Sequence, residues 1–482
     1  MSESSVYDGP RGPLQHRCAS CDSVHPNLQR CTGCRLVRYC SRDHQAQHRP
    51  KHKSLCKKMG KLRAKLEHED HAVRNATQDF MTPANAFETH MGHFWGLLNT
   101  RDYMRARFAV AEEARLAFTL DGATEALEHF QDMMRLCRSD NMGIRDHVPP
   151  LMLRLGRDQE CYDFIKWWET TGQEGDYDWG DPELAFLDVK DADVTEYPDF
   201  LLHRFGNLGF LISVMLLKVK MIIDIRNIKV IRKVVTGRLP IELWRHIELG
   251  AISGPLSRRF LARPYGDLIK AEGKLLQQCL DIGKNIIQVN RFFTPELLSP
   301  HRATFSDLPG AYSQGSREEM VLTMREVYPA WCETPGALDL LHEAQACATN
   351  GYRIEATAMQ TLCGQDAAAK RNIQKMVIDK TWDMLKLAAQ DSAYLGPSKD
   401  KPSLVHARDR QDEYELPPLR IVGGDAGGLA ALGAMGGMGD LGDEDDMGGN
   451  PFECECFDHT FHHEGSVDPS REAYEEYFAG LL

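Results

Sequence analysis

Residues 18–56 read CASCDSVHPNLQRCTGCRLVRYCSRDHQAQHRPKHKSLC, and this stretch decides how the N-terminal part of the chain folds. Cysteine and histidine recur in it as four close pairs: Cys18 with Cys21, Cys31 with Cys34, Cys40 with His44, and His52 with Cys56. Thiolate and neutral imidazole groups in sets of four suit zinc, which prefers a tetrahedral shell of sulfur and nitrogen. The spacing therefore predicts two four-coordinate zinc sites, and we call residues 18–56 the Cys/His module.

Local patterns suggest how the ligands are presented. Each C-x2-C pair can close a turn on one ion, and partners four residues apart share one face of a helix. Ser41 is a good N-cap for a helix that follows it. Pro50 lacks an N–H and suits the first position of a helix, so we expect two short helices rather than one between Ser41 and Cys56.

Spacing alone leaves two questions about the sites open. It does not say which pairs share an ion. His48 lies four residues from both His44 and His52, so it is a ninth candidate ligand by spacing.

The ligand pattern, with Tyr39-Cys40-Ser41 and with Gln45 after His44, resembles a MYND-type zinc finger. That resemblance implies a cross-braced arrangement, a protein or peptide partner, and no ligand role for His48. One departure is Arg49, which stands where many members carry a tryptophan that lines a groove for proline-rich peptides. The implied ligand sets are Cys18, Cys21, Cys40 and His44 for one zinc, and Cys31, Cys34, His52 and Cys56 for the other.

The zinc ions are expected to be structural. Few apolar residues lie in the module, so apolar burial alone cannot fold it, whereas a structural zinc contributes about 10 kcal/mol per site. Four protein ligands on each ion leave no open position for a substrate or an activated water. A disulfide framework would need a secretory signal, which residues 1–13 lack, so we expect an intracellular protein, cytoplasmic or nuclear.

Charge is unevenly distributed along the chain. Formal net charge is −13, yet residues 1–75 hold fifteen Lys or Arg against seven Asp or Glu, a net of +8. The basic residues look scattered and aromatic residues are few, which argues against nucleic acid as a partner. A nucleic-acid-associated regulator using the basic finger is kept as an alternative.

The segment after the module shows helical periodicity and a possible repeat. GATEALEHF at 122–130 and GRDQECYDF at 156–164 are offset by 34 residues, which is the period of tetratricopeptide helix pairs. Helices are expected at 101–117, 123–136, 141–155 and 158–168. Because Pro149 and Pro150 fall inside the third of these, that helix should start late or kink.

The fold class expected is mainly α, with a small cross-braced two-zinc finger, a tetratricopeptide-like helical body and a low-complexity C-terminal tail. An apolar run at 208–217 is too short to span a membrane. The expected layout is a flexible N-terminus at 1–16, the finger at 17–56, a helical lead-out at 57–98, helix pairs at 99–172, an acidic linker at 173–198, an α-helical domain at 199–396, a Gly/Asp-rich linker at 397–450, and a tail with a short amphipathic helix at 451–482.

No catalytic constellation accompanies these features. The chain has no G-x-S-x-G, no phosphate-binding loop and no H-E-x-x-H. The sequence therefore predicts a non-catalytic, zinc-binding interaction scaffold, with a SET-type lysine methyltransferase or a ubiquitin-ligase component as lesser alternatives. Cys454, Cys456, His459, His462 and His463 form a further cluster, whose spacing is poor for zinc and indicates adventitious binding.

Overall fold

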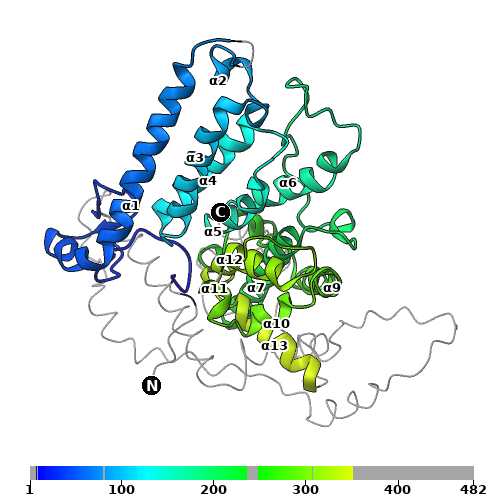
Figure 1. Cartoon of the computed structure of the whole chain (residues 1–482). Coiled ribbons are helices and arrows are strands. Elements are labelled where there is room, and N and C mark those ends of the chain that lie inside the picture. The colour runs from blue at the N-terminus through cyan, green and yellow to red at the C-terminus, as the bar shows by residue number, and fades with distance from the viewer. Residues whose placement is uncertain are drawn as a thin grey trace, which may run out of the picture. The chain divides into compact units, whose positions relative to one another are not determined.

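The computed structural model describes Tyr7 and residues 9–25, 27–79, 82–235, 248–306 and 308–350. These residues are mainly helical, as predicted, with one two-stranded antiparallel sheet in the Cys/His module (Figure 1). Its strands and helices are β1 (Gln29–Arg30), β2 (Arg38–Tyr39), α1 (Arg42–Arg74), α2 (Ala86–Thr89), α3 (Arg101–Arg115), α4 (Leu120–Leu136), α5 (Val148–Arg154), α6 (Asp158–Glu169), α7 (Leu208–Val235), α9 (Tyr265–Val289), α10 (Phe293–Leu298), α11 (Ala303–Ser306), α12 (Arg317–Glu333) and α13 (Ala337–Asn350).

The chain divides into two compact units. The first comprises Met1–Lys218 and Gln278–Leu338, and the second comprises Val219–Gln277 and Asp339–Leu482. The segment 351–396, the Gly/Asp-rich linker 397–450, and the tail with its Cys/His cluster and amphipathic helix lie outside the described residues.

Helix α1 runs without a break from Arg42 to Arg74 and contains Pro50. The expectation of two short helices was therefore wrong. The loss of one backbone hydrogen bond at Pro50 is tolerated because His44 and His52, on either side of it, are each fixed in a separate cysteine cluster. Ser41 caps the helix as predicted, since its hydroxyl accepts a hydrogen bond from the His44 N–H at 3.2 Å.

Helices α3 and α4 form a closely packed pair beside α1, and α5 and α6 form a second pair. Close approach in the first pair depends on Gly122, where a Cβ atom would lie 2.3 Å from the Ala114 carbonyl oxygen. Helix α5 starts only at Val148, which places both prolines in its first turn and confirms the predicted late start.

The 34-residue repeat remains a prediction. Gly122 is the third residue of α4, whereas Gly156 precedes α6 and takes a left-handed backbone with φ of 69°. The two glycines thus occupy unequal positions in their helix pairs, which counts against a regular tetratricopeptide repeat.

Residues 173–198 were expected to be a linker because of their acidity, but aromatic side chains join them to α6. Trp167 and Trp168 are almost fully buried, as expected for core residues. The ring of Phe186 lies 5.0 Å from that of Trp167, and the ring of Trp179 stacks on Trp168 at 5.6 Å. This segment is part of the helical body.

Tyr7 and Gly12 are also held in place, although both lie in the range that was expected to be flexible. Tyr7 is buried between Phe118 and Tyr328, with ring centroids 5.2 and 5.8 Å away. Farther along, the Gly12 N–H donates to the Cys332 carbonyl at 3.2 Å. The burial of one aromatic ring fixes the segment before the Cys/His module against α12.

Helix α7 spans the apolar run at 208–217 and continues to Val235. Within the second unit, Arg226 and Lys229 of α7 both pair with the buried carboxylate of Glu272 on α9, at 2.5 and 2.7 Å. Among the described helices, none has the length and apolar character needed to cross a bilayer.

Candidate metal centre

One group of ligands joins the first C-x2-C turn to the start of α1. The Sγ atom of Cys40 lies 3.7 Å from that of Cys18 and 3.8 Å from that of Cys21. The Nδ1 atom of His44 is 3.6 Å from Cys18 Sγ and 2.9 Å from Cys40 Sγ. These four atoms lie within 4.8 Å of one another.

The other group joins the second C-x2-C turn to the next turns of α1. The Nε2 atom of His52 lies 3.4 Å from the Sγ atoms of both Cys31 and Cys34. Cys56 Sγ completes the group at 3.9 Å from Cys31 Sγ. The pairing is interleaved along the chain, in the cross-braced order that the resemblance implies.

Both groups fit a tetrahedral zinc ion. With Zn–S bonds of about 2.3 Å and Zn–N bonds of about 2.0 Å, tetrahedral geometry requires S···S distances of about 3.8 Å and S···N distances of about 3.5 Å. Most of the distances above fall within a few tenths of an ångström of these values, and the donor set in each group is three sulfurs and one imidazole. Two Cys3His sites for two zinc ions are therefore present.

The two C-x2-C turns share one backbone conformation. Asp22 and Arg35, each directly after the second cysteine, have φ of 56° and 60°. Their N–H groups donate to the carbonyls of Cys18 and Cys31 at 2.8 and 2.9 Å. Within the second turn, a Cβ atom at Gly33 would lie 2.7 Å from Cys56 Sγ, so only glycine fits there.

Burial at the second site determines the protonation states of its ligands before a metal binds. Burial raises the pKa of the Cys34 thiol to about 11, so that without a metal this thiol keeps its proton at neutral pH. Burial and the nearby positive charges of His48 and Arg49 lower the pKa of His52, which keeps the ring neutral, as a ligand must be. Binding of a zinc ion at this site releases a proton from Cys34.

His48, the ninth candidate, is not in either group. Its Nδ1 atom lies 3.0 Å from the Tyr39 hydroxyl, and its ring stacks on His52 at 5.9 Å. His48 therefore packs against the ligand His52 and is not itself a ligand.

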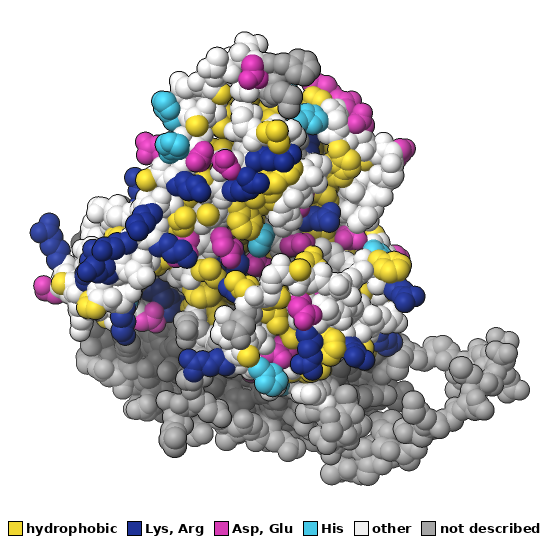
Figure 2. All heavy atoms as spheres, viewed as in Figure 1, with side chains coloured by type: hydrophobic (Ala, Val, Ile, Leu, Met, Phe, Trp, Pro, Cys, Tyr) yellow, Lys and Arg dark blue, Asp and Glu magenta, His cyan; other side chains and the backbone are white. Residues whose placement is uncertain are grey.

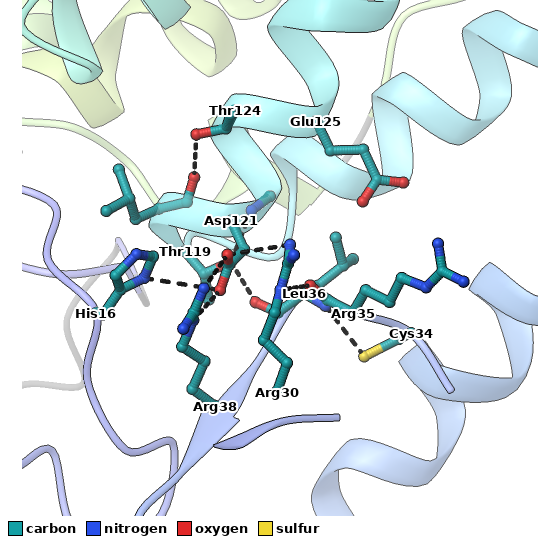
Figure 3. A network of polar contacts seen from close by, with 12 residues as sticks. His16, Arg30, Cys34, Arg35, Leu36, Arg38, Thr119, Asp121, Thr124 and Glu125 are labelled. Carbon is teal, nitrogen blue, oxygen red and sulfur yellow. Dashed lines mark hydrogen bonds and ion pairs between the residues drawn. The ribbon is translucent and has the colours of Figure 1, made fainter. Parts of the chain in front are cut away.

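The finger is fixed to α4 by an ion-pair network around Asp121 (Figure 3). Arg38 donates to both carboxylate oxygens of Asp121, at 2.7 and 2.9 Å, and Arg30 approaches the same carboxylate at 3.0 Å. Beside it, the Thr119 hydroxyl caps α4 and donates to the Leu36 carbonyl at 2.6 Å. The strands of the finger are thereby attached to the first turn of α4.

A second ion pair, from α1, also attaches this part of the chain to α4. The guanidinium of Arg63 donates to both carboxylate oxygens of Glu125, at 2.6 and 2.7 Å. Neither network was predicted, since ion pairs between residues 62 and 83 positions apart leave no local sequence signal.

Replacing Asp121 with Ala should weaken the attachment of the finger to α4 without removing the zinc ions from the finger. Arg38 and Arg30 would lose a shared carboxylate that is 9% exposed, at a cost of about 1–3 kcal/mol. Amide hydrogen exchange should become faster at residues 29–39, while zinc content stays at two. Glu128→Ala, an exposed change on the same helix, is the control, and equal exchange in both variants would disprove the docking role of Asp121.

A third cluster, Glu112, His147 and Glu326, contains metal-ligating side chains but is an ion-pair network. Arg115 pairs with Glu112 and Glu326, both at 2.6 Å, and so neutralises the carboxylates. Burial alone would lower the pKa of His147, but the Glu326 carboxylate at 2.9 Å outweighs it and raises the pKa. The cluster ties α3 and α12 together.

Comparison with known protein families gives one result. Residues 18–56 match the family model described as MYND finger. This match covers the module alone and not the helical body, and no match to a curated protein or to a solved structure was found. The MYND finger is a protein-interaction domain, and this one runs into α1 and is joined to α4 by the contacts described above.

Proposed function

We propose that this protein is a non-catalytic scaffold whose MYND finger binds a protein or peptide partner and is kept folded by two structural zinc ions. One ion is assigned to Cys18, Cys21, Cys40 and His44. The other is assigned to Cys31, Cys34, His52 and Cys56.

One observation carries this proposal: four side chains of the chain itself are available to each ion. A zinc shell filled by protein leaves no position for a substrate or an activated water, so the ions organise a surface and take no part in a reaction. The Arg38–Asp121 and Arg63–Glu125 pairs support a scaffold role, because they give the finger and the start of α1 a defined position on helix α4.

The test is capture of partners by the full-length chain and by a Cys31→Ser form. We expect finger-dependent partners to be retained by the intact chain and lost by Cys31→Ser, which removes one ligand of the second site. Cys137→Ser is the matched control, because it replaces a free thiol in the helical body. Identical partners with all three proteins would contradict the proposal, as would methyl or ubiquitin transfer that depends on a residue outside the finger.

A further inference from the structure

The exposed side of α1 carries a row of basic residues that sequence inspection missed. Arg49, Lys53, Lys57, Lys61 and Lys65 are spaced four apart, and all five are exposed. A step of four residues turns about 40° around the helix axis, so the row winds around α1, and neighbouring members such as Lys57, Lys61 and Lys65 lie on the same side, within about 80° of one another. The row exists because α1 continues through Pro50, and it corrects the expectation that the basic residues are scattered.

The charge on this part of α1 is not balanced by neighbouring acids. Residues 42–65 hold nine Lys or Arg and one carboxylate, Asp43. Lys58 and Arg63 are used in pairs with Glu113 and Glu125 of α3 and α4. Among the described residues, no carboxylate lies within 4.0 Å of any member of the row, and Figure 2 shows Lys and Arg side chains gathered over the finger and α1.

The geometry of the row suits an extended polyanion. Each step of four residues rises about 6 Å, and the whole row spans about 24 Å. One strand of a nucleic-acid duplex carries one phosphate charge per about 3.4 Å of duplex axis, which is slightly more than half of one step of the row. Neighbouring cations on one side of α1 can therefore each meet a phosphate, about two phosphates apart along a backbone.

The other residues on this side of α1 exclude competing partners. Ala46, Gly60 and Ala64 are exposed between the basic side chains and are small. A membrane-surface helix needs large apolar residues to insert, and a protein interface needs buried aromatic or aliphatic anchors. Neither kind of residue is exposed on α1 between Arg42 and Lys65, whereas binding to a phosphate backbone requires charge alone.

We propose that the exposed side of α1 binds the phosphate backbone of a nucleic acid, without reading its sequence. This function is separate from the proposed binding of a protein or peptide partner by the finger and does not depend on it. Its affinity comes from released counterions, so binding must weaken steeply as salt rises.

The test uses the full-length, zinc-loaded protein with fluorescein-labelled 20-base-pair RNA and DNA duplexes of mixed sequence, followed by fluorescence anisotropy. For the DNA duplex, three phosphate contacts, by Lys57, Lys61 and Lys65, predict that log Kobs against log[salt] has a slope of about −2.7. Two unrelated sequences should bind with equal affinity. No binding at low salt, or a slope near zero, would overturn the proposal.

A triple variant, Lys57→Gln/Lys61→Gln/Lys65→Gln, locates the site. We expect its slope to be shallower by about 3 and its affinity to fall about 100-fold at 0.1 M salt. The matched control is Arg258→Gln/Lys270→Gln/Lys274→Gln, which removes three exposed positive charges elsewhere and should bind within about twofold of the wild type. An equal loss of affinity in both variants would mean that net charge, and not the row, drives binding. That result would disprove the proposal.

Two further measurements complete the experiment. Zinc content and far-ultraviolet circular dichroism should be unchanged in both variants, because all six side chains are exposed. Poly-glutamate and phosphatidylserine vesicles serve as competitors. If either displaces the duplex at an equal concentration of negative charge, the surface prefers a different partner and the proposal fails.

Discussion

Replacing Cys34 with Ser should remove one of two zinc ions and unfold the MYND finger. Cys34 Sγ is fully buried beside His52, and serine is a poor zinc ligand. A structural site contributes about 10 kcal/mol at neutral pH, more than the small apolar core of the finger can supply. Elemental analysis should give about one zinc per chain, and limited proteolysis should cut first within residues 18–56.

The helical body should survive this substitution. Helices α3 to α6 pack through Phe130, Trp167 and other buried side chains that do not involve zinc. Cys137→Ser is again the matched control and should keep two zinc ions and a protease-resistant finger. A Cys34→Ser protein with two zinc ions and normal resistance would show that Cys34 is not a ligand.

Replacing Glu333 with Ala should cause the largest loss of stability in the helical body. Its carboxylate accepts from Arg154 Nε and Nη2 at 2.9 Å, and the two side chains are 2% and 3% exposed. Burial raises the pKa of Glu333, an effect that Arg154 opposes. Removal of the carboxylate leaves the Arg154 charge buried without this partner, which costs about 3–5 kcal/mol.

Thermal unfolding should show this loss as a fall in Tm of about 10 °C for the transition of the first unit. The double variant Arg154→Met/Glu333→Leu is the informative control, since a buried pair replaced by apolar groups of similar size is often neutral. It should be more stable than Glu333→Ala. If the double variant is the less stable of the two, the unpaired-charge explanation is wrong.

The metal sites were predictable because zinc imposes a local chemical pattern. Ligand type and spacing picked out Cys31, Cys34, His52 and Cys56 as candidates, but the interleaved order came from resemblance, since spacing does not encode which pairs meet. His48 shows the limit of spacing: it lies between His44 and His52 but faces Tyr39.

Other features depend on tertiary structure and had no local signal. Pro50 predicted a helix boundary from backbone chemistry, and the two Cys/His clusters on either side overrode it. The basic row followed from that continuous helix and was therefore missed as well. Trp179 and Phe186 in the acidic segment 173–198 indicated packing against the helices. The prediction of a linker relied on the acidic composition and overlooked them.

Zinc stoichiometry tests the central claim most directly. Full-length protein, purified without added metal and analysed by inductively coupled plasma mass spectrometry, should contain two equivalents of zinc per chain. Strong chelation should remove both and make residues 18–56 sensitive to protease, and re-addition of zinc should restore resistance. A content well below two equivalents, or a finger that stays resistant after zinc is removed, would contradict the account.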